Sequence, residues 1–398
     1  MSIILKKLRS SDNLIYIAFA SAFLPFILTG LVLVGLGIYL LLAKRDRVFV
    51  YNGKVLFVIF TVYTAIIGLL RDNLIGFCCS VGFFFVFVIS YYVRSEVTGD
   101  VFQKSLDLSC WMCFPVCIST IAEKLSHSHV EDYRCQSWFF NANYLCTMMA
   151  MMIVVCTYKL LITSKGKPFY LLTILACSIT MYLGESIFAI IEVGVGIFTL
   201  LILYKKRSIL ITSIAIAGIA AIMLYINPGL FPRILNSSTS TDQRIYVWDQ
   251  AIEFIKISPF FGHGFMSYYH LQEIHGSLWT TAHTHNFIFE PLLCFGIVGT
   301  VTFVAFLWTY YEKISECKSL LRKNKAANLI LALSAAIIIH CTVDLTVLWI
   351  QTGLLFALII GCIGVDEKAL NRRIKACLGK KTETENTTPK EDTNNEQK

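Results

Sequence analysis

Charged side chains are scarce in this chain of 398 residues: aspartate, glutamate, lysine and arginine together make up 15% of it. Hydrophobic residues make up 56%, and the mean hydropathy is +0.66. A water-soluble domain needs more charge than this on its surface, so the composition excludes that class. What the chain has instead is a series of uninterrupted apolar runs, many of them near the roughly 20 residues that cross a bilayer as a helix.

Other absences narrow the function further. The 14 cysteines form no disulfide framework, because nearly all lie inside apolar runs and only Cys135 lies plainly in a predicted outside loop. No small-residue cleavage site follows the first apolar run, so we expect a retained N-terminal anchor. No DxD-like acidic cluster lies outside the membrane, which argues against a divalent-metal mechanism. No internal repeat of the kind that transporters tend to show is found.

The apolar runs predict an all-α polytopic membrane protein with about twelve transmembrane helices. The expected spans are 14–27, 28–43, 55–70, 74–93, 105–122, 138–158, 168–184, 186–204, 208–226, 286–311, 326–343 and 346–364. In the first pair, Pro25 and Gly30 favour a short hairpin over one long helix. This divides the chain into a cytoplasmic N-terminus (1–13), membrane helices (14–226), a large outside loop (227–284), further membrane helices (285–365) and a largely disordered cytoplasmic tail (366–398).

The distribution of basic residues supports this topology. Of the 34 lysines and arginines, 28 fall in segments that the prediction assigns to the cytoplasm and six fall outside. The positive-inside rule expects such a bias. The net charge of +8 is thereby explained by topology and attraction to the membrane surface, and it does not indicate a nucleic-acid partner.

The loop 227–284 is the longest polar interruption, and a loop of that length in a compact domain is usually functional. Thr241-Asp242 can begin a helix in which Ile245, Trp248, Ile252 and Ile255 recur at helical spacing, as in an amphipathic helix lying on the outer leaflet. Arg244 lies at its start. Helix N-termini favour anions, so this arginine is a candidate phosphate ligand, with a solvated surface arginine as the alternative.

The most informative stretch follows, where His283-Thr-His285-Asn286 runs into the apolar span 286–311. Histidine suits proton transfer because its ordinary pKa lies near neutrality. Two alternatives stay open: the histidines merely end a loop, or they form a metal pair, which would need one or two further ligands. Among the acids in or beside the spans, Asp344 shares a helix face with His340 and favours function, whereas Glu192 favours a helix–helix hydrogen bond.

Several blocks together resemble the bacterial O-antigen ligase and O-antigen polymerase (Wzy-like) superfamily. They are Asp242-Gln-Arg244-x3-Trp248, Ser258-Pro-Phe-Phe-Gly262-His-Gly264, His285-Asn286-x9-Gly296-x2-Gly299, Phe140-Asn-Ala-Asn143-Tyr144 and His340-Cys-Thr-Val-Asp344. The resemblance covers roughly residues 135–365. Family members often carry an arginine between the seventh and eighth predicted spans. Here Glu185 stands near that turn, which shifts the phosphate role to Arg244.

The resemblance implies a GT-C-type membrane glycosyltransferase that needs no metal or cofactor. It would move a glycan from an undecaprenyl-diphosphate type carrier to a hydroxyl of a glycan or glycolipid acceptor, inverting the anomeric centre. The active site would lie on the extracytoplasmic face of the bacterial cytoplasmic membrane. His285 would activate the acceptor and Arg244 would stabilise the leaving diphosphate. The expected substrate-binding residues are Arg233, Trp248, His283, Asn286 and Asp344.

Two choices remain at this point. A polymerase and a ligase use the same donor and differ only in the acceptor, so the sequence leaves both open. The alternative function is a multi-span transporter or flippase of lipid-linked saccharides, which twelve spans alone would suit equally well.

Overall fold

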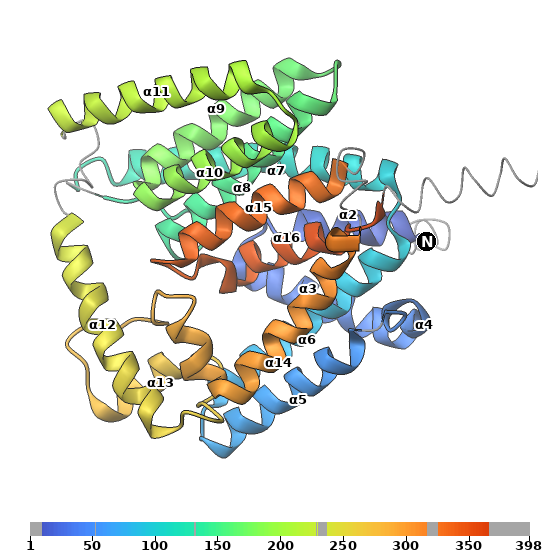
Figure 1. Cartoon of the computed structure of the whole chain (residues 1–398), viewed down its shortest axis with the longest axis vertical. Helices are drawn as coiled ribbons and strands as arrows, with labels where there is room; N and C mark the ends of the chain where they lie inside the picture. The colour runs from blue at the N-terminus through green and yellow to red at the C-terminus, as the bar shows by residue number, and fades with distance from the viewer. Residues whose placement is uncertain are drawn as a thin grey trace, which may run out of the picture.

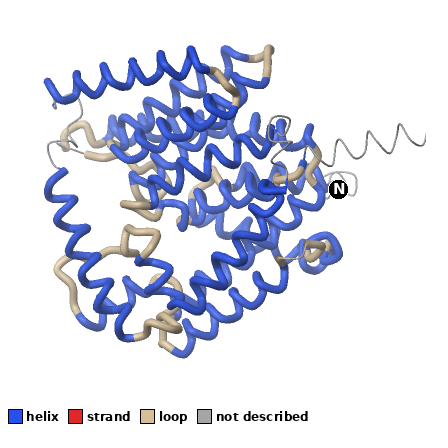
Figure 2. The backbone as a smooth tube through the Cα atoms, viewed as in Figure 1, coloured by secondary structure: helices blue, strands red, loops and turns tan. Residues whose placement is uncertain are grey.

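The structure is a computed structural model that describes residues 10–51, 53–130, 133–227, 229, 237–316 and 325–365. Within these ranges the chain forms helices and loops, without a β-strand (Figure 2). The helices of the first half are α2 (Ser11–Ser21), α3 (Phe26–Ala43), α4 (Arg45–Val48), α5 (Lys54–Leu70), α6 (Leu74–Glu96), α7 (Gly99–Ser126), α8 (Ala142–Ile162) and α9 (Lys167–Gly184). Those of the second half are α10 (Ile187–Leu203), α11 (Arg207–Ile226), α12 (Ser237–Ile257), α13 (Ser267–His275), α14 (Phe289–Glu316), α15 (Lys325–Cys341), the 3-10 turn η3 (Thr346–Leu348) and α16 (Ile350–Gly361).

Each predicted span coincides with a helix, including the first pair, where α2 and α3 are separate helices and Pro25 precedes α3. Helices α3, α6, α7, α8, α9 and residues 289–312 of α14 are long and apolar enough to cross a membrane, and several further apolar helices are shorter. Backbone polar groups inside a bilayer must be satisfied within the segment, which a helix does. The protein is therefore an integral membrane protein of helical build. The number of twelve spans stays a prediction.

Helix α8 lies at the centre of the bundle. Its residues Leu145–Cys156 are buried without interruption, and α9, α10 and α15 pack against it. The outer helices instead expose apolar side chains. On α11, at the edge of the bundle (Figure 1), Ile211, Ile216 and Ile219 are all exposed. An apolar exterior around a packed interior is what a lipid-facing bundle requires.

Helices α12 and α13 lie together beside the start of α14, at the lower left in Figure 1, whereas α4 lies at the opposite right-hand side. Helix α12 packs Val247, Ala251 and Phe254 against α13 and α14. The predicted stripe is divided: Ile245 and Ile252 remain exposed, whereas Ile255 is partly buried against this cluster and Trp248 contacts the loop before α14. The sequence pattern thus identified the helix but not its protein-packed side, and contact of the stripe with the outer leaflet stays a prediction.

Helix α14 is broken at Gly296, which has φ 61° and ψ −172°. The segment 258–264 closes the break. The backbone amides of Ile297 and Val298 donate to the carbonyls of Pro259 (2.9 Å) and Phe260 (3.1 Å), and the amide of Gly264 donates to the Cys294 carbonyl (2.7 Å). A side chain at position 296 would collide with the backbone of Phe260. The two glycine-containing blocks of the sequence are thus in contact, and we call the contact between segment 258–264 and the break at Gly296 the joint.

Candidate active site

The loop between α13 and α14 carries the predicted histidines and is fixed from several directions. The Trp248 indole N–H donates to the Thr284 carbonyl (3.0 Å), and the Thr284 amide donates to Glu290 Oε2 (2.8 Å). Asn286 Oδ1 accepts from the amide of Ile288 (2.8 Å), and its Nδ2 donates to the Thr342 carbonyl (3.2 Å). Trp248 and Asn286, both expected to bind substrate, therefore hold the loop backbone next to the end of α15.

His285 itself has a left-handed backbone, with φ 56°. Such a conformation costs a non-glycine residue on the order of 1–3 kcal/mol, and persists only where the surroundings impose it. Its Nδ1 lies 3.0 Å from Asp344 Oδ1, and its side chain is 25% exposed against 3% for the aspartate. The imidazole is thus anchored at one nitrogen and accessible from outside.

Asp344 follows the end of α15, and its carboxylate is the centre of the cluster. Besides His285, Asn143 Nδ2 donates to its Oδ2 (2.6 Å), and His283 Nε2 lies 3.5 Å from its Oδ1. Burial raises the pKa of the Asp344 carboxyl, but its interactions with His285 and then His283 outweigh burial and hold the pKa well below its ordinary value. An ionised Asp344 accepts a hydrogen bond from the Nδ1–H of His285, which leaves a lone pair on Nε2 that can accept a proton.

His283 is buried and plays a different part. Its Nδ1 accepts the backbone N–H of His285 (3.2 Å), so its proton belongs on Nε2, beside the Tyr144 hydroxyl (3.2 Å) and Asp344. Burial, and then the neighbouring His285, lower the pKa of the His283 ring from 6.5 to about 3, against an opposing effect of Asp344. The His283 ring is therefore neutral, and the hydrogen bonds of its two nitrogens stabilise the loop that carries His285.

The ligand atoms of His283, His285 and Asp344 lie within 4.8 Å of one another, so the alternative of a metal pair gains a third candidate ligand. The hydrogen bonds do not fit a metal. A metal on His283 Nε2 would move that ring's proton to Nδ1, and Nδ1 faces the N–H of His285. Metal-bound histidines normally donate from the second nitrogen, whereas here that nitrogen has to accept.

A small pocket of about 80 Å³ opens beside this cluster. Its ionisable lining residues are Arg134, Glu185, Arg244, His340 and Asp344. Arg244, near the start of α12, donates from Nε to the Val343 carbonyl (3.0 Å), and its guanidinium carbon lies 5.8 Å from the centre of the Phe188 ring. The pocket has room for a compact polar group and not for a glycan.

The remaining predicted residues are distributed as follows. Arg233 lies outside the described residues. Glu185 follows α9 in a left-handed conformation and lines the pocket. Glu192 accepts from His340 Nδ1 (2.6 Å) across two helices, as the sequence favoured. Arg134 was missed, because nothing distinguished it from the other basic residues of the predicted outside segments.

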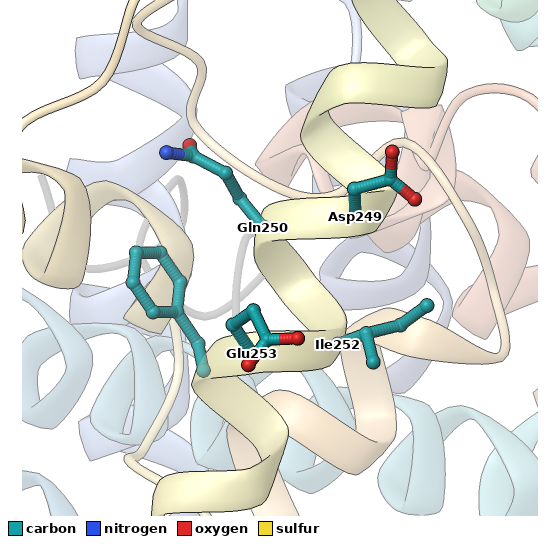
Figure 3. A pocket seen from close by; sticks show the side chains of 5 residues that line it. Asp249, Gln250, Ile252 and Glu253 are labelled. Atoms are coloured by element: carbon teal, nitrogen blue, oxygen red, sulfur yellow. The ribbon is translucent and has the colours of Figure 1, made fainter.

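A second hollow lies on α12 and is lined by Asp249, Gln250, Ile252, Glu253 and Phe254. Figure 3 shows Gln250 extending to one side of the helix and Asp249 and Ile252 to the other. These groups do not converge on a common point. The hollow therefore offers no counterpart to the arrangement around Asp344.

Comparison with known proteins bears on the family resemblance. Residues 171–304 match the family model described as O-antigen ligase, a segment that includes Arg244 and His285 but not Asp344. A protein of Rickettsia felis, described as a candidate polysaccharide ligase, is 23% identical over 190 residues. That match spans 44% of this chain and 46% of the relative, so less than half of the relative's length is covered. The resemblance to the O-antigen ligase and polymerase superfamily is thereby confirmed, and the chain is a membrane protein that is similar to O-antigen ligases over residues 171–304.

Proposed function

We propose that this protein is a membrane glycosyltransferase that moves a glycan from a polyprenyl-diphosphate carrier to a hydroxyl of a glycan or glycolipid acceptor. The observation that carries the proposal is the His285–Asp344 pair, joined at 3.0 Å and lying beside a pocket that Arg244 lines. A base with a fixed tautomer next to a pocket that a guanidinium lines is what transfer from an anionic leaving group requires.

The reaction that this geometry supports is a direct displacement. Nε2 of His285 takes the proton of the acceptor hydroxyl, and the acceptor oxygen forms a bond to the anomeric carbon. The bond from that carbon to the diphosphate breaks, and its electron pair remains on the diphosphate. Arg244 stabilises the charge on this leaving group. One displacement inverts the anomeric centre, and no step requires a metal ion.

The membrane arrangement is part of the proposal. We assign residues 14–226 and 285–365 to twelve spans, 1–13 and 366–398 to the cytoplasm, and 227–284 to the extracytoplasmic side of a bacterial cytoplasmic membrane. Two observations support this: 28 of 34 basic residues fall on the assigned cytoplasmic side, and α12 and α13 lie opposite the basic helix α4 (Figure 1).

The first test is transfer by purified full-length protein in liposomes, with a polyprenyl-diphosphate glycan as donor. His285→Ala should remove transfer while membrane expression is retained, because a general base contributes on the order of 10²–10⁴-fold. His283→Ala should be less severe. Retention of more than about a tenth of the wild-type rate by His285→Ala would contradict this assignment. Movement of donor across the bilayer without transfer would favour the transporter alternative.

Deletion in the native host separates polymerase from ligase. A polymerase deletion leaves single glycan units without long chains. A ligase deletion leaves long lipid-linked chains that are not attached to their acceptor. Glycan profiling of the envelope distinguishes the two outcomes.

A further inference from the structure

The pocket beside Asp344 is lined by a second arginine that comes from a distant part of the chain. Arg134 precedes α8, whereas Arg244 lies on α12. The guanidinium of Arg134 is held at two points: Nε donates to the Gly184 carbonyl (3.2 Å), and Nη2 donates to Asn143 Oδ1 (2.8 Å). These bonds fix the plane of the guanidinium at the wall of the pocket.

Arg134 is connected to His285 by an unbroken series of hydrogen bonds. Asn143 accepts from Arg134 with its carbonyl oxygen and donates from its amide nitrogen to Asp344 Oδ2 (2.6 Å). Asp344 Oδ1 in turn accepts from His285 Nδ1 (3.0 Å). Each donor in this series faces an acceptor, and Asp344 accepts from both of its neighbours, so the orientation of the asparagine amide is determined by the cation on one side and the carboxylate on the other.

The charge balance of the pocket favours a role for Arg134 in anion binding. Its lining includes the carboxylates of Glu185 and Asp344 and the guanidiniums of Arg134 and Arg244, together with His340. With Arg244 alone, two carboxylates would oppose one guanidinium. An anionic ligand would then meet a net repulsive lining, which Arg134 offsets.

We propose that Arg134 is a second guanidinium for the diphosphate of the lipid-linked donor, and that Asn143 is a positioning residue that couples this donor site to the His285 base. The inference rests on the proposed function. A guanidinium can bind two phosphate oxygens at once, so two guanidiniums suit a diphosphate and give it an advantage over a monophosphate.

The test measures binding of polyprenyl diphosphate and polyprenyl monophosphate, both without sugar, to the purified full-length protein. Arg134→Gln should weaken diphosphate binding by roughly 10–100-fold, the range expected for loss of a charge-assisted hydrogen bond. Monophosphate binding should change less, so the ratio of the Kd for monophosphate to the Kd for diphosphate should decrease. Lys124→Gln is the matched control, because Lys124 lies in the last turn of α7, the helix that precedes Arg134, donates to the Tyr133 carbonyl (2.8 Å) and does not line the pocket.

A second variant guards against loss of fold. If Arg134→Gln unfolds below the temperature of the binding assay, Arg134→Lys takes its place. Lysine keeps the charge but lacks the planar guanidinium, so this variant should show a weaker preference for diphosphate than wild type. Wild-type preference in a folded Arg134→Gln or Arg134→Lys protein overturns the role of Arg134. Absence of any diphosphate preference in the wild-type protein would instead contradict the donor class of the proposed function.

Asn143 is tested by the split between kcat and donor KM. Asn143→Ala should mainly lower kcat, because Asp344 and His285 lose a support, while the diphosphate preference persists through the remaining bond from Arg134 to Gly184. An Asn143→Ala protein with wild-type kcat, or one that loses the diphosphate preference as fully as Arg134→Gln, refutes the coupling.

Discussion

Replacing Asp344 by asparagine is the sharpest test of the site, because it changes hydrogen-bond polarity without changing shape. The carboxylate accepts from Asn143 on one oxygen and from His285 on the other. An amide can accept on only one side. If its NH2 group faces His285, Nδ1 of that ring has to accept, so the proton moves to Nε2 and the base is lost.

The opposite orientation of the new amide is no better. Its NH2 group would then meet the NH2 group of Asn143. Rotation of the Asn143 amide would in turn direct its NH2 group at the guanidinium of Arg134, where a carbonyl oxygen now accepts at 2.8 Å. Both arrangements of this second orientation leave one donor facing another, which costs about 1–3 kcal/mol when the group is buried. The first orientation, which removes the base, is therefore favoured.

We therefore expect Asp344→Asn to lower kcat by on the order of 10²–10⁴-fold, the upper value being that of the comparable change in a serine-protease triad. Binding of polyprenyl diphosphate should change much less. The assay is glycan transfer at saturating donor, with thermal unfolding to confirm the fold. Asp249→Asn on α12 is the matched control, because that residue is exposed and lies outside the cluster. Transfer by Asp344→Asn within about tenfold of wild type would refute the dyad.

Three further predictions concern Arg244, the topology of the large loop and the break in α14. Arg244→Ala should lose transfer and Arg244→Lys should recover only part of it, because an ammonium cannot bind two phosphate oxygens in one plane; wild-type donor KM in Arg244→Ala would show a surface role. A cysteine that replaces Leu278, which is 78% exposed, in a variant of the protein without its native cysteines should react with an impermeant maleimide in intact cells. Labelling only after lysis would contradict the assigned topology. Gly296→Ala should lower the unfolding temperature, because its φ of 61° and the backbone of Phe260 oppose a side chain. The control Gly82→Ala, with open space around it, should be neutral or stabilising, and equal effects would argue against the joint.

The helices could be predicted from the sequence because a bilayer leaves the backbone few other options. The same physics limits the prediction. Apolar residues face lipid and protein alike. The stripe of Ile245, Trp248, Ile252 and Ile255 therefore identified α12, but it did not identify Val247, Ala251 and Phe254 as the residues that pack on α13 and α14. Whether all twelve segments cross the membrane stays a prediction for the same reason.

The candidate site could be predicted in its parts but not in its connections. His285 and Asp344 each stood out as ionisable groups at a membrane boundary, but only tertiary structure brings residues 59 positions apart to 3.0 Å. Arg134 carried no local pattern, since its importance comes from Asn143 and the pocket around it. Local spacing reveals chemistry on one helix or loop, and it is silent about partners from other helices.

The joint between the segment 258–264 and the broken helix α14 limits how these two parts of the chain can move relative to each other. Lifting this segment away would break the bonds that Ile297, Val298 and Gly264 make across the break, at roughly 0.5–1.5 kcal/mol for each. The segment 258–264 is therefore poorly suited to swing away from α14 during the reaction. In chimeras between related enzymes, residues 258–264 and α14 have to be exchanged as one unit, since either half alone would leave the other's backbone groups without partners.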